Sequence, residues 1–223
     1  MLVLFDIDGT LLMGNGVGRV ATHAAMLDVF GTTGRLDEHK FAGKTDWYTL
    51  LELLGAEGFA PADVERLMPD YERALAHHMA QAVTDRQVTA LPGAHDAVSA
   101  LREDSRFLLG IVTGNLYTTA PIKLRAAGFD PDWFPIGAYG SEAIDRNDLP
   151  PLAMQRATAH NGRSYGPQDV VIIGDTLMDI ACARAVGARI IAVATGFSTR
   201  AELAAAAPDH LLDSLEDLLP LLR

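Results

Sequence analysis

The pattern of apolar and polar residues along the chain combines short unbroken apolar runs with stretches of helix-like spacing. The runs at residues 2–5, 107–112 and 170–173 lack regular polar alternation, which is typical of strands buried on both faces of a parallel sheet. Between the later runs, apolar residues recur every three or four positions, which indicates helices. Strands and helices in this alternation predict an α/β fold with a doubly wound, mostly parallel sheet and right-handed crossovers.

The alternation is clearest after residue 86. There the pattern predicts helices at residues 94–104, 117–127, 149–160, 178–186 and 215–222, and strands at residues 107–112, 136–139, 170–173, 189–193 and 210–212. Gly128 stands directly after the second of these helices, where glycine commonly ends a helix.

Residues 15–85 show helical spacing without a strand-like run. Apolar residues at positions 20, 24, 27 and 30 fit one helix, those at 47, 50, 51 and 54 fit a second, and Pro61 is the expected first residue of a third. The glycine-rich residues 14–18 and the segment 83–93 are expected to be hinges. We therefore predict a core domain of residues 1–14 plus 86–223 and an all-helical cap domain of residues 15–85, called the cap segment below.

Composition narrows the possible functions. The chain has 223 residues, of which 49% are hydrophobic, so it can bury one sizeable core with a smaller companion. Its net charge of -11 argues against nucleic acid as a partner, because nucleic-acid binding depends on clustered Lys and Arg. A phosphorylated metabolite would have to be attracted by a metal ion and a few local cations, since the overall field repels anions.

Cys182 is the one cysteine, so no intramolecular disulfide can form, and a small core residue is its expected role. The N-terminus does not resemble a signal peptide, and no apolar run reaches the ~20 residues of a membrane span. We expect a cytoplasmic protein, a monomer or homodimer, with neither membrane nor nucleic acid as a partner.

Two acidic residues directly follow the first strand. Asp6 and Asp8 stand two positions apart at its carboxyl end, and Gly9-Thr10 then turns the chain, where ligands bind in open α/β sheets. Carboxylates this close repel each other unless a cation lies between them or one keeps its proton. Mg²⁺ would satisfy the pair, whereas capping of a turn is the simpler reading of an isolated Asp-x-Asp.

The strand at residues 107–112 also ends in polar groups. Thr113 offers a hydroxyl, and Gly114 and Asn115 offer backbone N–H groups near the start of a helix, where an anion is favoured. This arrangement suits a phosphate group, although an ordinary strand-to-helix turn would have the same sequence.

A further acidic pair follows the strand at residues 170–173. Asp175 would complete a magnesium site, and Asp179 lies one helical turn later as a second ligand or an anchor. Helix N-capping is the structural alternative for both residues.

The stretch DIDGTL, which begins at Asp6, resembles the first motif of the haloacid dehalogenase-like (HAD) phosphohydrolases position by position. Thr113 is similar to the Ser or Thr of the second motif, and the segment from Gly174 to Asp179 resembles the fourth. The resemblance covers essentially the whole chain and points to the phosphoglycolate phosphatase type with a helical cap. It implies a Rossmann-like core and Mg²⁺-dependent hydrolysis of a small phosphomonoester.

The resemblance also implies roles for individual residues. Asp6 would attack phosphorus to form an aspartyl-phosphate, and Asp8 would protonate the leaving oxygen and then activate water. Magnesium would be bound by Asp6, the Asp8 carbonyl and Asp175, with Asp179 as a further candidate. The residues expected to bind the phosphoryl group or the rest of the substrate are Thr113, Gly9, Gly114, Asn115, Arg146 and Lys44.

The cation opposite the acids is the least defined of these residues. The family usually has Lys just before the helix that precedes the fourth motif, and spacing places Arg146 there. Arg offers a rigid, planar guanidinium, whereas Lys offers an ammonium on a flexible chain. Lys123 is the competing cation, for which a solvated helix position is the simpler reading. Lys44 lies in a loop between two predicted cap helices and is a candidate substrate contact; the alternative is a helix start capped by Asp46.

Three other functions are compatible with parts of the pattern. A phosphoglucomutase-like enzyme would share the core motifs but return the phosphoryl group to a sugar. A dehalogenase is disfavoured, because such relatives lack a counterpart of Asp8. A non-catalytic metabolite-binding protein with this fold is disfavoured by the intact set of catalytic residues.

Overall fold

The computed structural model describes residues 1–41 and 43–222, and a six-stranded parallel sheet forms its centre. The strand order is β5-β4-β1-β6-β7-β8. The strands are β1 (Leu2–Phe5), β4 (Leu108–Thr113), β5 (Ile136–Tyr139), β6 (Val170–Gly174), β7 (Arg189–Val193) and β8 (His210–Leu212). Every neighbouring pair is parallel, so the carboxyl ends of all six strands share one edge. The predicted doubly wound α/β fold is confirmed.

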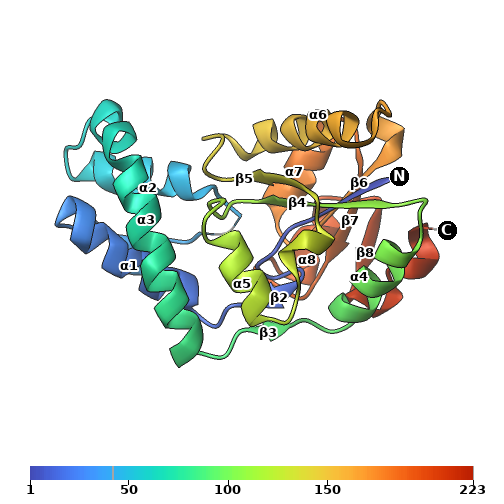
Figure 1. Ribbon diagram of the computed structural model, residues 1–223, viewed down its shortest axis with the longest axis horizontal. Helices are drawn as coiled ribbons and strands as arrows, with labels where there is room; N and C mark the ends of the chain where they lie inside the picture. Colours follow the sequence, from blue (N-terminus) through green and yellow to red (C-terminus); the bar gives the residue numbers. More distant parts are fainter. Residues whose placement is uncertain (42, 223) are drawn as a thin grey trace.

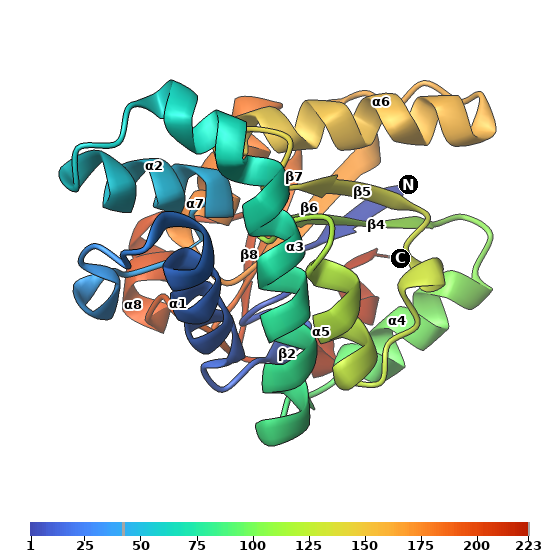
Figure 2. The same cartoon turned by 60° about the vertical axis from the view of Figure 1, so that its left-hand side comes forward.

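Alternate residues of β1 belong to two hydrophobic cores, one on each face of the sheet. Val3 and Phe5 pack in the core that includes residues of α4 and α5, whereas Leu2 and Leu4 pack in the core that includes residues of α6 and α7. Burial on both sides explains why β1 is apolar without alternation. The helices are α4 (Ala94–Glu103), α5 (Ala120–Ala126), α6 (Leu149–Asn161), α7 (Leu177–Ala185) and the short α8 (Arg200–Ala205). Figure 2 shows α6 and α4 on opposite sides of the sheet.

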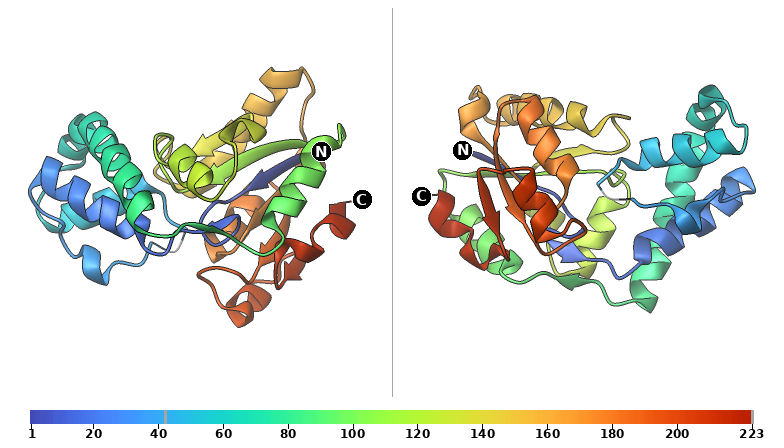
Figure 3. Two further views of the ribbon diagram at one scale, coloured as in Figure 1. Left: turned by 60° about the horizontal axis from the view of Figure 1, so that its bottom comes forward. Right: turned by 180° about the vertical axis from the view of Figure 1, so that it is seen from behind.

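Helices α1 (Val17–Phe30), α2 (Asp46–Ala56) and α3 (Pro61–Asp85) lie together at one end of the molecule (Figure 1). Both chain termini lie at the opposite end, as the two views of Figure 3 also show. The Phe30 ring contacts those of Phe59 and Tyr71, with centroids 5.8 and 5.9 Å away. No strand occurs among the described residues of the cap segment.

The buried face of α1 differs from the face that its larger apolar residues indicate. Val20 and Leu27 are 42% and 47% exposed, whereas Ala21, Ala25 and Met26 are fully buried. Helix α1 packs against α3 in the cap segment. The predicted helix is present, but its packing face is rotated towards the alanines.

The two connections between the core and the cap segment pair with each other. Strand β2 (Leu12–Met13) is antiparallel to β3 (Thr89–Ala90), with Met13 opposite Thr89. Residues 83–85, which we expected to be part of the second hinge, instead form the last residues of α3. A two-residue strand contains too few positions to show a period, so the apolar pattern could not predict this ribbon.

The C-terminal segment differs from the predicted helix at residues 215–222. It forms two 3-10 turns, η5 (Leu215–Asp217) and η6 (Leu219–Leu222). Pro220 cannot donate a backbone hydrogen bond, so it interrupts an α-helix at that place. The other 3-10 turns are η1 (Leu36–Glu38), η2 (Pro131–Trp133), η3 (Arg146–Asp148) and η4 (Pro167–Asp169). None of the described helices combines the length and apolar composition needed to cross a membrane.

Candidate active site

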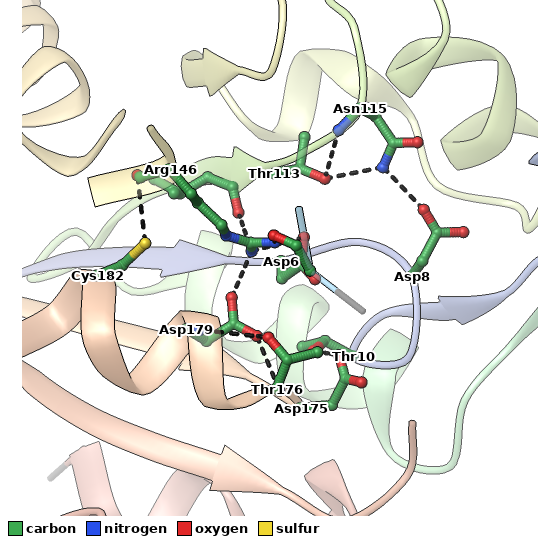
Figure 4. Close-up of polar contacts among 12 residues, drawn as sticks. Asp6, Asp8, Thr10, Thr113, Asn115, Arg146, Asp175, Thr176, Asp179 and Cys182 are labelled. Carbon is green, nitrogen blue, oxygen red and sulfur yellow. Dashed lines mark hydrogen bonds and ion pairs between the residues drawn. The ribbon is translucent and has the colours of Figure 1, made fainter. Parts of the chain in front are cut away.

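The carboxyl ends of β1, β4 and β6 bring together polar residues from distant parts of the sequence (Figure 4). Strand β1 leads into Asp6 and Asp8, β4 ends at Thr113, and β6 ends directly before Asp175. Because β1 lies between β4 and β6, its two acids stand at the centre of this edge. A cavity of about 520 Å³ opens here and is lined by core residues such as Asp6 and Thr113 and by residues of the cap segment.

Arg146 is buried beside two carboxylates. It opens the turn η3 and is 2% exposed. Its Nη2 lies 3.2 Å from Asp6 Oδ1 and also pairs with Asp179 Oδ1, while its Nη1 donates to the Gly43 carbonyl at 2.7 Å. Of the two cations proposed from the sequence, Arg146 is therefore the one in contact with Asp6.

Asp175 is fully buried and held by two donors. The Thr10 hydroxyl donates to Oδ1 at 3.1 Å, and the backbone N–H of Phe197 donates to Oδ2 at 2.8 Å. Gly9, with φ +88°, passes so close that a Cβ there would lie 2.4 Å from the Asp175 carboxylate. A side chain at position 9 would therefore displace Asp175.

Asp6, Asp175 and Asp179 form a buried acidic cluster, in which one oxygen of each lies within 4.8 Å of the others. Burial raises the pKa of Asp6 to about 6; Arg146 opposes this rise, and Asp179 and Asp8 add to it. Burial also raises the pKa of Asp175 well above its usual range, with Asp179 and Asp6 adding to the effect. A divalent cation would relieve this repulsion, and carboxylate oxygens are the ligands that Mg²⁺ prefers. The donor set therefore fits a hard metal ion.

Asp179 also caps helix α7. Its Oδ2 accepts from the Thr176 backbone N–H at 2.9 Å and from the Thr176 hydroxyl at 2.6 Å, while Thr176 caps the helix in return. Since Oδ1 is paired with Arg146, both oxygens have donors. The capping role considered from the sequence is present for Asp179, and its service as a metal ligand stays a prediction.

Asp8 belongs to a second polar group. Its Oδ2 accepts from Asn115 Nδ2 at 2.8 Å and from Lys123 Nζ at 2.7 Å. Asn115 also donates to the Thr113 hydroxyl at 2.8 Å and accepts from Lys123 at 2.6 Å. Lys123 is 5% exposed, so the solvated helix position expected for it is wrong.

A loop of the cap segment contacts the turn after β4. The Asp46 backbone N–H donates to the Gly114 carbonyl at 2.8 Å, and the Asp46 carboxylate accepts from the Leu116 backbone N–H at 3.1 Å. The Thr45 hydroxyl donates to the Ile144 carbonyl at 2.8 Å and also caps α2. Thr45, rather than Asp46, is therefore the N-cap of that helix. Burial raises the pKa of Asp46 to about 6, with Lys123 and the Leu116 N–H opposing the rise and Asp8 adding to it.

The backbone of Lys44 approaches the core more closely than its side chain does. A Cβ on Gly114 would lie 2.1 Å from the Lys44 carbonyl oxygen, so glycine is required for this contact. The Lys44 ammonium pairs with Glu52 at 2.5 Å and lies over the Tyr48 ring, 5.1 Å from its centroid. Lys44 lines the cavity, whereas Gly9 does not. Substrate binding by either residue stays a prediction.

Sequence reasoning gave no role to several groups that complete the site. The donors to Asp175 from Thr10 and Phe197 and the capping by Thr176 were missed. A usable signal was present for Phe197, because the sequence Thr195-Gly-Phe follows β7 at the same edge of the sheet. Cys182 is buried as expected; its thiol donates to the Arg146 carbonyl at 3.2 Å, and burial raises its pKa to about 12.

Comparison with known proteins links this arrangement to one family. Residues 148–218 match a family described as HAD-hydrolase-like. A phosphoglycolate phosphatase from Synechococcus elongatus is 28% identical over 217 residues, which cover 97% of this chain and 94% of that protein. The chain is thus similar to HAD-like hydrolases, by a family match to its C-terminal third and by a phosphatase relative along most of its length.

Further proteins resemble the chain over nearly its whole length. The pyrophosphatase PpaX of Listeria innocua is 27% identical, over 99% of this chain and 95% of that protein. The crystal structure of a hydrolase from Pseudomonas syringae has a TM-score of 0.70 and 23% identity, covering 99% of this chain and 96% of that one. This structural likeness extends the shared fold over the cap segment as well as the core.

Proposed function

We propose that this protein is a HAD-like, metal-dependent phosphatase that cleaves a small phosphomonoester through an aspartyl-phosphate at Asp6. The observation that carries the proposal is the position of Asp6, which belongs to a buried acidic cluster suited to a cation and lies 3.2 Å from the guanidinium of Arg146. Nucleophilic attack on a phosphate dianion needs such positive charge close by. Two relatives named as a phosphatase and a pyrophosphatase support the same reaction class.

In the first step, an Asp6 carboxylate oxygen attacks phosphorus and the bond from phosphorus to the leaving oxygen breaks. Asp8 gives its proton to that oxygen, so the substrate departs as an alcohol. Thr113, which is buried at the end of β4, and the backbone of Gly114 would hold the phosphoryl oxygens. Arg146 would balance the charge that builds up on them.

In the second step, water attacks the phosphorus of the aspartyl-phosphate. Asp8, now ionised, accepts a proton from this water, and the bond from phosphorus to the Asp6 oxygen breaks. Inorganic phosphate is released, and both carboxyl groups return to their starting states. Asp8 can serve both steps because it lines the same cavity as Asp6.

Asp6 and Asp175 would hold the metal ion, together with the Asp8 carbonyl and with Asp179 as a further candidate. When bound, Mg²⁺ supplies Lewis-acid stabilisation of the transferring phosphoryl group. Burial is the main cause of the raised pKa values of Asp6 and Asp175, and the neighbouring carboxylates add to it, so a bound cation would favour the ionised form of both groups.

We further propose that residues 15–85 act as a cap domain that closes over the core. At the start of α2, Asp46 contacts the turn after β4 and Thr45 contacts Ile144, and the cavity beside these contacts is lined by residues of both the cap segment and the core. Such a lid would keep bulk water from the intermediate and admit only small substrates.

The test is turnover of 4-nitrophenyl phosphate by the purified protein with Mg²⁺ or with EDTA. We expect activity with Mg²⁺, its loss with EDTA, and loss of about a thousandfold or more in Asp6→Asn, because the nucleophile is removed. Metal-independent turnover, or full activity of Asp6→Asn, would overturn the mechanism.

A further inference from the structure

Lys123 is a buried cation that the mechanism above leaves without a role. It lies on α5, a helix of the core, and only 5% of it is exposed. A buried ammonium is costly unless it is paired and hydrogen-bonded. The hydrogen-bond partners of its ammonium among the described residues are Asp8 and Asn115, so its position serves the second polar group of the site.

The three side chains form a closed triangle of hydrogen bonds. Lys123 Nζ donates to Asp8 Oδ2 at 2.7 Å and to Asn115 Oδ1 at 2.6 Å, and Asn115 Nδ2 donates to the same Asp8 oxygen at 2.8 Å. Lys has donors only, so it fixes which end of the Asn115 amide faces it. Figure 4 shows Asn115 reaching from Thr113 to Asp8.

Both donors to Asp8 meet one of its two oxygens. Among residues 1–41 and 43–222, no hydrogen bond reaches Oδ1, which lies beside the hinge residue Gly14, where a Cβ would be 3.3 Å away. The carboxyl group is thus anchored by Oδ2 while Oδ1 is left to exchange a proton. A general acid must be held within hydrogen-bond reach of the leaving oxygen, so this anchoring bears directly on its efficiency.

Lys123 and Arg146 therefore act on different carboxylates. Arg146 contacts Asp6 and Asp179, whereas Lys123 contacts Asp8 and has no ion pair with the acidic cluster. The Lys123 ammonium lies beside Gly18 of α1, where a Cβ would be in ordinary contact with Nζ at 3.5 Å.

We propose that Lys123, acting with Asn115, is a positioning residue that orients Asp8 towards the leaving oxygen. This inference rests on the proposed phosphatase function, in which Asp8 protonates that oxygen. Lys123 would not hold the transferring phosphoryl group, a role that remains with Arg146.

The experiment compares two esters that differ in their need for a proton. The leaving group of 4-nitrophenyl phosphate departs as the anion, whereas that of phenyl phosphate benefits more from general acid catalysis. We expect Lys123→Met to lower kcat/KM for phenyl phosphate about tenfold more than for 4-nitrophenyl phosphate. Because kcat/KM reports the steps up to the first irreversible one, later hydrolysis of the intermediate does not obscure this ratio.

A double-mutant cycle separates positioning from other roles. Asp8→Asn should show the same selective loss, and adding Lys123→Met to it should change the ratio between the two esters no further. Lys123→Arg keeps the buried charge and should give an intermediate ratio, which provides a second variant if Lys123→Met does not fold. Arg125→Met, which removes an exposed cation from the same helix, is the control and should leave the ratio unchanged.

Equal losses of kcat/KM for both esters in Lys123→Met would overturn the positioning role. The role would also be overturned if adding Lys123→Met to Asp8→Asn still changed the ratio of kcat/KM between the two esters. In that case wild-type turnover would still support the phosphatase function. A wild-type protein that hydrolyses neither ester with Mg²⁺ would overturn that function and the positioning role with it.

Discussion

Arg146 Nη2 lies 3.2 Å from Asp6 Oδ1, and both side chains are almost completely buried. Removing the cation by Arg146→Met leaves Asp6 and Asp179 facing each other without compensation. We expect the free energy of unfolding, measured with urea at pH 7 in EDTA, to fall by about 3–5 kcal/mol.

The matched control for this variant is Arg163→Met. Arg163 pairs with Asp169 at 2.7 Å on the surface, and its side chain is 53% exposed. Its loss should cost at most about 1 kcal/mol, because exposed ion pairs contribute little. Equal losses in both variants would show that burial of the Arg146 pair has no energetic consequence.

Metal binding should stabilise the fold through Asp175. Magnesium at a hundred times its dissociation constant should add about 2.7 kcal/mol to the free energy of unfolding, because the unfolded chain lacks the site. Asp175→Asn should lose this increment without becoming less stable in EDTA, since it removes one of the repelling acids. Thermal unfolding with Mg²⁺ and with EDTA checks both statements, and an unchanged increment in Asp175→Asn would exclude it as a ligand.

Asp46 should make stability depend on pH. Burial raises its pKa in the folded protein to about 6 from 3.8, so the unfolded chain loses this proton first as pH increases. The contribution of Asp46 to stability is therefore present below pH 4 and is lost between about pH 4 and pH 6. Asn can still accept from Leu116, so Asp46→Asn should gain stability relative to wild type across this interval. Urea unfolding in EDTA measures the difference, and a difference that does not vary with pH would contradict the assignment.

Gly114→Ala should displace the loop of the cap segment. A methyl group there would lie 2.1 Å from the Lys44 carbonyl oxygen. Because this oxygen belongs to the backbone, the clash can be relieved only if the loop moves. We expect kcat/KM for 4-nitrophenyl phosphate to fall by about a hundredfold, and hydrogen exchange at the Asp46 N–H to accelerate. Gly55→Ala, in α2 with no atom within 4 Å of the new methyl group, is the control and should retain activity. A fully active Gly114→Ala would show that the loop need not touch the core during turnover.

The core was predictable because its strands are buried on both faces. A strand such as β1 must be apolar at every position, so a short unbroken run identifies it without knowledge of its neighbours. The packing face of α1 could not be predicted in this way, because Val20 and Leu27 have helical spacing but Ala21 and Ala25 are the residues that the fold buries. Which of two apolar faces is buried depends on a partner that the local sequence does not reveal.

The site shows the same limit. The sequence predicts that Asp6, Asp8 and Asp175 lie together because they stand at or just after the ends of two strands, and parallel strands end at one edge. Lys123 lies in the middle of a helix, where its direction depends on how α5 packs against the sheet. Phe197 contacts Asp175 through its backbone N–H, so its place after β7 is a usable signal for the contact and the identity of its side chain is not.

The pairing of β2 with β3 means that the chain leaves the core and returns to it at adjacent positions. Met13 and Thr89 are direct partners in an antiparallel ladder, so only about one strand spacing, ~4.8 Å, separates the two points. A two-residue β-turn of the Asn-Gly type could bridge them and excise every residue between. The cap segment is thus inserted into a hairpin, so its length can change without altering the order of the sheet.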